Sequence, residues 1–222
     1  MVDPQPSITI SGIRIDEPIT SLTDLVVSAV CFFAYYQLTK RKLPGRSLLF
    51  FRYYFLLMGI ATFLGGTISH AFLYMLSFEW KIPAWIVSML GVALIERSAI
   101  EYAKPLIKPR IGQFFLVVNI VELLTVATIA ISTLNFRWVE FHGGYGLLGV
   151  VMSFHLYTYS RTKDIGSKYI MTGVFVAALA AGAFTFHIAP HVWFNHLDLS
   201  HVLMAVASYI FYRGALLLDT SS

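Results

Sequence analysis

The chain has 222 residues, of which 57% are hydrophobic and 13% are charged, and its apolar residues form long blocks separated by short polar gaps. This composition excludes a water-soluble globular domain and is typical of an integral membrane protein. The net charge of +4 comes from cations in the gaps, where they favour contact with lipid headgroups, so we expect membrane lipid as a partner and no nucleic acid.

A short polar segment precedes the first apolar block. It carries three carboxylates and a single cation, Arg14, and it lacks the basic head and the cleavage site of a signal peptide. We therefore expect residues 1–18 to remain in the mature protein, outside the membrane. Pro18 is expected in the first turn of the first helix.

Seven apolar blocks follow, each near the roughly 20 residues that a helix needs to cross hydrocarbon. The blocks are 19–38, 48–76, 82–107, 111–134, 138–159, 167–189 and 197–218. The gaps between them are too short for a further domain. We therefore expect residues 19–218 to form one all-α, integral membrane bundle of seven transmembrane helices.

The cations in the gaps indicate the orientation of this bundle. They concentrate after the first, third and fifth helices and near the end of the seventh, whereas the alternate gaps carry only Lys81 and Arg137. By the positive-inside rule, the N-terminus then lies outside or in a lumen, and the C-terminus lies in the cytoplasm.

This orientation places six of the seven histidines in one layer near the outer face. The six are His70, His142, His187, His191, His196 and His201. His70 and His201 lie inside a span, where an unpaired imidazole has no water to satisfy it. Imidazoles that converge at this depth favour a metal site, and hydrogen bonding at helix ends is the alternative for His142, His187 and His191.

The segment 195–201, NHLDLSH, opens the last helix. At about 100° per residue, Asp198 and His201 lie about 60° apart on one face, whereas His196 and His201 are about 140° apart. Both histidines can reach one ion if the helix begins near Leu197 or Asp198, with His196 in the preceding turn and Asp198 capping the first turn. Asp198 is then a direct ligand or, as we favour, the acceptor of a ligating histidine's second ring N–H.

The second helix supplies the other wall of this site. Gly65 and Gly66 permit close approach of a neighbouring helix. Thr67 lies about 60° from His70 on a regular helix, so we expect its hydroxyl to point at whatever His70 binds.

Seven helices with an outer N-terminus, a histidine near the outer end of helix two and two histidines opening helix seven resemble the CREST superfamily, which contains alkaline ceramidases and progestin/adiponectin-type receptors. Members carry a serine four residues before the helix-two histidine, and a serine-histidine, a three-residue gap and a histidine in the last helix. This chain has Gly66 at the first serine position and a four-residue gap between His196 and His201. It would be a divergent member.

The family also has an aspartate near the start of helix three, where this chain has no carboxylate in residues 82–85. Asp198, Asp24 and Glu79 are the candidates to substitute for it. Asp24 lies in the histidine layer, where it either belongs to the site or makes local hydrogen bonds.

The resemblance implies a zinc ion, Zn²⁺, held by His70, His196 and His201 with a bound water in a lipid-filled cavity. Such an ion lowers the pKa of its water towards about 7 and polarises a carbonyl oxygen. We therefore expect a zinc-dependent, ceramidase-like hydrolase of an amide or ester bond in a lipid. Thr67 would donate to the developing oxyanion, and Asp198 would orient a ligand or shuttle a proton.

Three other functions remain open. The first is a seven-helix receptor or lipid-binding protein in which zinc is structural, and the second is haem binding by facing histidines. The third is transport, because Glu96, Arg97 and Glu122 lie within spans and can mark a proton or ion path. We favour pairing of these three with polar groups on neighbouring helices.

Overall fold

The computed structural model describes residues 5–42 and 44–218. Their long helices are α1 (Pro18–Arg41), α2 (Arg46–Leu64), α3 (Ile82–Ala103), α4 (Pro109–Thr133), α5 (Arg137–Gly144), α6 (Met152–Thr162), α7 (Ile165–Thr185) and α8 (His196–Leu217). Two π-helical segments, η1 (Gly65–Ala71) and η5 (Tyr145–Val151), continue α2 and join α5 to α6 without a break. Short 3-10 helices are η2 (Leu73–Met75), η3 (Phe78–Lys81) and η4 (Lys104–Leu106).

The seven predicted helices are therefore present, the fifth being the continuous run α5–η5–α6. Six of the seven are long and apolar enough to cross a membrane, and the fifth is the exception among the described residues. Their ends lie within a few residues of the predicted blocks. The largest differences are at the end of the second helix, where η1 ends at Ala71 and not at residue 76, and at the end of the sixth, where α7 ends at Thr185 and not at residue 189.

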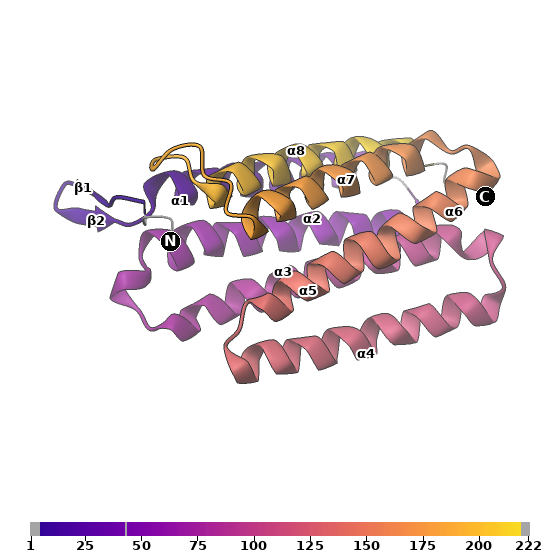
Figure 1. The fold of residues 1–222 in the computed structure, drawn as a ribbon. Coiled ribbons are helices and arrows are strands. Elements are labelled where there is room, and N and C mark those ends of the chain that lie inside the picture. Colours follow the sequence, from indigo (N-terminus) through magenta and orange to yellow (C-terminus); the bar gives the residue numbers. More distant parts are fainter. Residues whose placement is uncertain (1–4, 43, 219–222) are drawn as a thin grey trace.

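The helices run along one long axis, with consecutive helices side by side (Figure 1). α1 packs against both α2 and α8, so the first and last helices of the bundle are neighbours. α4 packs mainly on α3 and α5 and lies at the edge of the bundle (Figure 1). One core of buried side chains extends across α1, α2, α3, α6, α7 and α8 and includes Leu116 of α4, with Phe51, Phe55 and Phe211 among its largest members. A smaller cluster of buried side chains joins α3, α4 and α5.

Two short strands, β1 (Ile8–Ile10) and β2 (Ile13–Ile15), form an antiparallel hairpin that the sequence did not predict. Ser11 and Gly12 have positive φ angles of 52° and 81°, as a tight two-residue hairpin turn requires. The hairpin projects from the end of the bundle that also carries η1 and the loop between α7 and α8 (Figure 1). We call this the hairpin end.

Gln5 ties the N-terminal segment to the hairpin end of the bundle. Its side-chain oxygen accepts hydrogen bonds from the backbone N–H groups of Ile19 (2.9 Å) and Thr20 (3.3 Å), which are among the first N–H groups of α1 and lack partners within the helix. Its amide nitrogen donates to the Trp193 carbonyl (3.1 Å) and to Asp198 (3.2 Å). A single buried amide thus joins the starts of the first and last helices.

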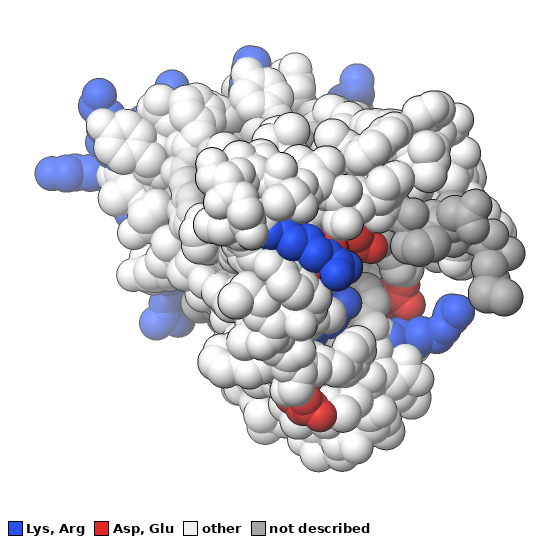
Figure 2. Space-filling view, turned by 90° about the vertical axis from the view of Figure 1, so that its left-hand side faces the viewer, with Lys and Arg blue, Asp and Glu red and all other residues white. Residues whose placement is uncertain are grey.

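Charge is distributed unevenly between the two ends. At the hairpin end the cations of the described chain are Arg14, Lys81 and Arg137, and all other lysines and arginines lie in the opposite half. Figure 2 shows the hairpin end, where most of the surface is uncharged and acidic and basic side chains meet near the middle. This asymmetry is the pattern from which the sequence predicted the orientation.

Candidate metal centre

The second helix widens into a π-helical turn where it approaches α1. Gly65 and Gly66 make this approach possible, because a Cβ atom at Gly65 would lie 2.6 Å from Asp24 Oδ2 and one at Gly66 would lie 2.8 Å from the Ser21 carbonyl oxygen. The close approach predicted for these glycines is confirmed. π-helical turns are rare and frequently occur at functional sites, and this one carries His70.

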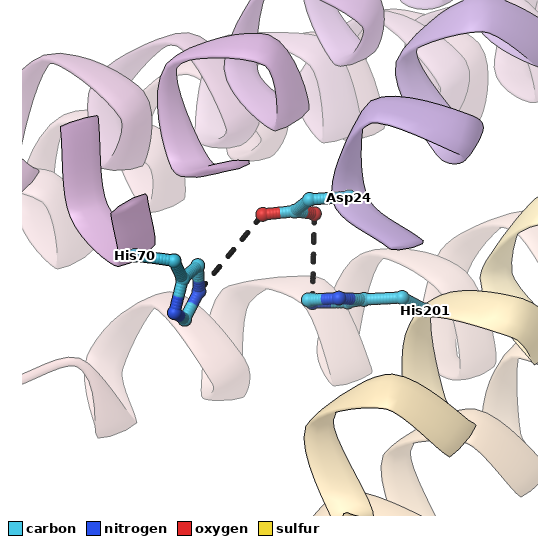
Figure 3. Close-up of side chains that lie close together, drawn as sticks. All are labelled: Asp24, His70 and His201. Carbon is cyan, nitrogen blue, oxygen red and sulfur yellow. Dashed lines mark ion pairs between the residues drawn. The ribbon is translucent and has the colours of Figure 1, made fainter. Parts of the chain in front are cut away.

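Asp24, His70 and His201 come together here from α1, η1 and α8, and we call them the Asp24 group. Figure 3 shows the two imidazole rings turned towards the Asp24 carboxylate. The Nε2 atoms of His70 and His201 lie 3.9 Å and 3.5 Å from the two Asp24 oxygens, and one potential ligand atom from each residue lies within 4.8 Å of the others. Asp24 is 5% exposed and lies about 9 Å along α1 from its start.

The other nitrogen of each ring is held by a partner outside the group. His70 Nδ1 lies 2.5 Å from Glu17 Oε2, and His201 Nδ1 lies 3.1 Å from Thr23 Oγ1. The Thr23 hydroxyl has backbone carbonyls at 3.0 Å to donate to, so it accepts from His201. Both histidines then carry their proton on Nδ1 and present the Nε2 lone pair to Asp24, which is how metal-ligating histidines are commonly oriented.

Glu17 is suited to hold the His70 proton. Burial raises the pKa of its carboxyl, but the hydrogen bond with His70 and the nearby charge of Lys81 outweigh burial and leave the pKa below its ordinary value. Glu17 is therefore an ionised acceptor at neutral pH. It precedes α1 in a left-handed conformation (φ 44°), which is uncommon for a residue other than glycine.

The Asp24 group consists entirely of acceptors that face one another. No hydrogen-bond donor reaches the Asp24 carboxylate from residues 5–42 and 44–218, and both facing nitrogens are lone pairs. Such an arrangement is repulsive unless a proton or a cation lies among the three residues. Two imidazoles and one carboxylate form a common three-ligand set for catalytic zinc, with the fourth position open.

His196 does not join this group. α8 begins at His196 itself, one residue earlier than the turn geometry needed, with Asn195 as the N-cap. His196 therefore obeys helical geometry and points away from His201, and its ring lies 4.7 Å from that of His187 and 5.7 Å from that of Phe184. In this group Asp24 takes the place that was predicted for His196.

Asp198 caps the first turn of α8, as predicted, within a reciprocal capping box. Its Oδ2 accepts from the Asn195 backbone N–H (2.7 Å) and from Gln5, and the Asn195 side chain accepts from Leu197 and Asp198. Among the described residues it makes no hydrogen bond to His70 or His201, so it is not the acceptor of a ligand N–H. Its Oδ1 is buried and has no hydrogen-bond partner within residues 5–42 and 44–218.

Thr67 is also not directed at the group. Its hydroxyl donates to the Phe63 carbonyl at 2.6 Å, within its own helix. The prediction assumed 3.6 residues per turn, whereas the i→i+5 pattern of η1 makes a wider turn, so Thr67 and His70 do not share a face as calculated.

Residues 19–220 match the Family of unknown function (DUF6962). The chain belongs to this family. Searches of curated proteins and of solved structures find no significant match. The DUF6962 match includes all three residues of the Asp24 group, whereas Glu17 and Gln5 precede it.

Three residues in and around the Asp24 group were not assigned from the sequence. Asp24 was named as one of several acidic candidates, and the signal for it was its depth in the histidine layer. Glu17 and Thr23 gave no motif, because each contacts a histidine from a distant part of the chain: 53 residues separate Glu17 from His70, and 178 separate Thr23 from His201.

The remaining outer histidines of this DUF6962 chain form local contacts. His187 Nδ1 lies 3.1 Å from the Thr185 carbonyl, and His191 Nδ1 accepts from the Trp193 backbone N–H at 3.1 Å. These are the helix-end hydrogen bonds that were the alternative to metal binding. His142 is bonded differently, to Glu122 and to the Met89 carbonyl, and it is not part of the Asp24 group.

Proposed function

We propose that this protein is a zinc-dependent hydrolase that cleaves an amide or ester bond of a membrane lipid, with the metal held by Asp24, His70 and His201. The observation that carries the proposal is the group of mutually facing acceptors, each histidine having its Nδ1 proton directed outward. A distant relationship to the ceramidase and receptor superfamily is part of the proposal. The ligand set differs from that implied by the resemblance, because a helix-one aspartate stands in for His196.

A bound zinc ion would supply a Lewis acid that lowers the pKa of a water molecule towards about 7 and polarises a carbonyl oxygen. Glu17 keeps the His70 ring in the tautomer that exposes Nε2, and Thr23 does the same for His201. Asp24 contributes the negative charge that a dication needs in a buried site.

Asp198 is the proposed proton acceptor. It lies one turn before His201 on the same face of α8, and Gln5 bridges it to the backbone of Thr20, one turn before Asp24 in α1. Asp198 Oδ1 and Thr20 Oγ1 are both buried without a partner among the described residues. They form a polar layer between the Asp24 group and the hairpin end, through which water and protons would pass.

The substrate class follows from the surroundings of the site. The helices that carry the Asp24 group are among the six that are long and apolar enough to cross a membrane. In the proposed orientation the hairpin end faces the outside or a lumen, and the site lies in the adjacent leaflet. A lipid with its scissile bond near the headgroup would reach this depth.

A second candidate is a receptor or lipid-binding protein in which the metal only joins α1, α2 and α8. It is favoured by the two positions at which a hydroxyl was expected: Gly66 replaces the family serine, and the Thr67 hydroxyl donates to the Phe63 carbonyl. The hydrolase and the receptor would share the metal site, and only the hydrolase would cleave a lipid.

The test begins with elemental analysis of the purified protein in detergent. We expect one zinc ion that His201→Ala removes and that His187→Ala, a histidine outside the group, leaves in place. Hydrolysis of ceramide and of phosphatidylcholine is then measured before and after chelation. Turnover of either lipid that stops with the chelator, returns with zinc and is lost in His201→Ala supports the enzyme.

Zinc binding without turnover of either lipid would support the structural alternative. Full zinc content in His201→Ala, or iron in place of zinc in the wild-type protein, would contradict the proposed ligands or the proposed metal.

A further inference from the structure

A second group of ionisable side chains lies in the bundle, and it shares no residue with the Asp24 group. Glu96 of α3, Glu122 of α4 and His142 of α5 each offer one potential ligand atom, and these atoms lie within 4.8 Å of one another. Glu96 and His142 are completely buried, and the Glu122 side chain is 13% exposed. We call these residues the Glu96 group. Charged groups at this depth are costly and require a compensating partner.

His142 has a fixed orientation within the Glu96 group. Its Nε2 lies 2.9 Å from the Met89 carbonyl oxygen, which can only accept, so Nε2 carries a proton. Its Nδ1 faces both carboxylate oxygens of Glu122, at 2.8 Å and 3.0 Å. A histidine held by a backbone carbonyl on one nitrogen, with the other nitrogen facing a carboxylate, has the orientation of a metal ligand.

One carboxylate oxygen of Glu96 is also held by a hydrogen bond, while the other is free. Its Oε2 accepts from the Asn119 amide at 3.1 Å, while its Oε1 is buried and has no hydrogen-bond partner among the described residues. A Cβ atom at Gly146 would lie 2.5 Å from Oε1, so this oxygen contacts the fifth helix at Gly146. Gly146 lies four residues after His142, on the same face of that helix. The unpartnered oxygen therefore points at the face that presents His142.

A dication would balance the charges of the Glu96 group. With His142 neutral and both glutamates ionised, the group carries two negative charges, which a divalent ion would cancel. Without an ion, a proton on His142 can compensate Glu122, and the buried Glu96 carboxyl then needs a proton of its own to be neutral. Arg97 follows Glu96 in the chain, but its guanidinium lies over the Phe50 ring.

We propose that Glu96, Glu122 and His142 bind a second divalent transition-metal ion between α3, α4 and α5. Two carboxylates and one imidazole form a harder ligand set than the Asp24 group and suit manganese or iron(II) as well as zinc. The site is independent of the proposed hydrolase, because its three ligands lie on α3, α4 and α5, whereas the Asp24 group lies on α1, η1 and α8.

The experiment counts ions in a protein whose Asp24 group has been disabled. Purified His201→Ala protein is stripped with a chelator, loaded with Mn²⁺, freed of excess metal by gel filtration and analysed for metal content. We expect one Mn²⁺ per chain in this protein and close to none after the added change Glu96→Gln. Glu101→Gln, which removes a carboxylate of α3 that pairs with Lys104, is the matched control and should retain one Mn²⁺.

Absence of Mn²⁺ from the His201→Ala protein would overturn the proposal and would leave an ion pair between His142 and Glu122. Mn²⁺ that persists in full after Glu96→Gln would also overturn it. If the Glu96→Gln protein does not elute as a single species, the ion count of the His201→Ala protein alone decides. Asp24→Asn can replace His201→Ala as the change that disables the Asp24 group. Failure of lipid hydrolysis would not affect this count.

Discussion

At the scale of single residues, Gly65 determines whether Asp24 can face the two histidines. Any side chain at position 65 would place its Cβ atom 2.6 Å from Asp24 Oδ2, so the carboxylate would have to move. Gly182 in α7 offers a contrast, because no atom outside its own helix lies within 4 Å of its Cβ position.

We therefore predict that Gly65→Ala lowers the zinc affinity of the Asp24 group by about ten- to hundredfold, the range found when groups that orient metal ligands are altered. Gly182→Ala should leave zinc affinity unchanged, since helix propensity alone is altered there. Competition of the purified proteins against a fluorescent zinc chelator measures both affinities. Equal affinities for the two variants would contradict the role assigned to Gly65.

For single residues, the sequence indicated how deep each side chain lies in the membrane but not the direction in which it faces around its helix axis. The positive-inside rule and the helix boundaries placed His70 and His201 in one layer, and the structure brings these two together. Which third residue meets them depends on how α1 is rotated against η1. That rotation is set by side-chain packing around two glycines, and no periodicity of a single sequence encodes it.

At the scale of elements, the start of α8 decides the orientation of two predicted site residues. The capping box between Asn195 and Asp198 begins the helix at His196, and this turns His196 away from the metal position and leaves Asp198 Oδ1 free. The sequence showed both capping residues, but the helix was expected to start at Leu197 or Asp198. An error of one residue at a helix start changes the direction of a side chain by about 100°.

We predict that Asn195→Ala destabilises the protein by about 1 kcal/mol, because two N–H groups of α8 lose their acceptor. Asn195→Asp keeps a capping oxygen and is the matched control. Chemical unfolding in detergent, followed by circular dichroism, gives the two free energies of unfolding. The capping role would be contradicted if the alanine and aspartate variants were equally stable.

The π-helical turn η1 is the other element that pattern analysis could not reveal. A 3.6-residue period describes α-helices, and a wider turn of seven residues inside an apolar block leaves that pattern almost unchanged. The positions of Thr67 and His70 relative to one another were wrong for this reason. The block itself, and its length, were predicted well.

At the scale of the whole molecule, seven helices follow from the apolar blocks alone, while the hairpin does not, since its six strand residues are too few for a clear alternating pattern. The orientation of the bundle is a prediction that one property of the chain makes easy to test. Its single cysteine, Cys31, is completely buried, so added thiols can be labelled against a silent background.

Ser7→Cys at the hairpin end and Ser160→Cys at the opposite end are matched exposed positions for this test. We expect a membrane-impermeant maleimide to label Ser7→Cys in intact cells, and Ser160→Cys only after the membrane is opened. If the protein resides in an internal membrane, sealed vesicles of that membrane replace cells, and Ser160→Cys is then the position labelled from the cytoplasmic side. Labelling of both variants from the same side would contradict the spanning bundle.

The contact of α1 with α8 also has a consequence for biosynthesis. Thr23 and His201 are 178 residues apart, and at the usual 5–20 residues per second the ribosome needs on the order of ten seconds to make the chain between them. During that interval the first two helices exist with Asp24 and His70 in place but without the third ligand. If the proposed site binds metal, tight capture has to wait for the last helix, and metal loading would then be one of the final events of assembly and a marker of a chain that has been synthesised to its end.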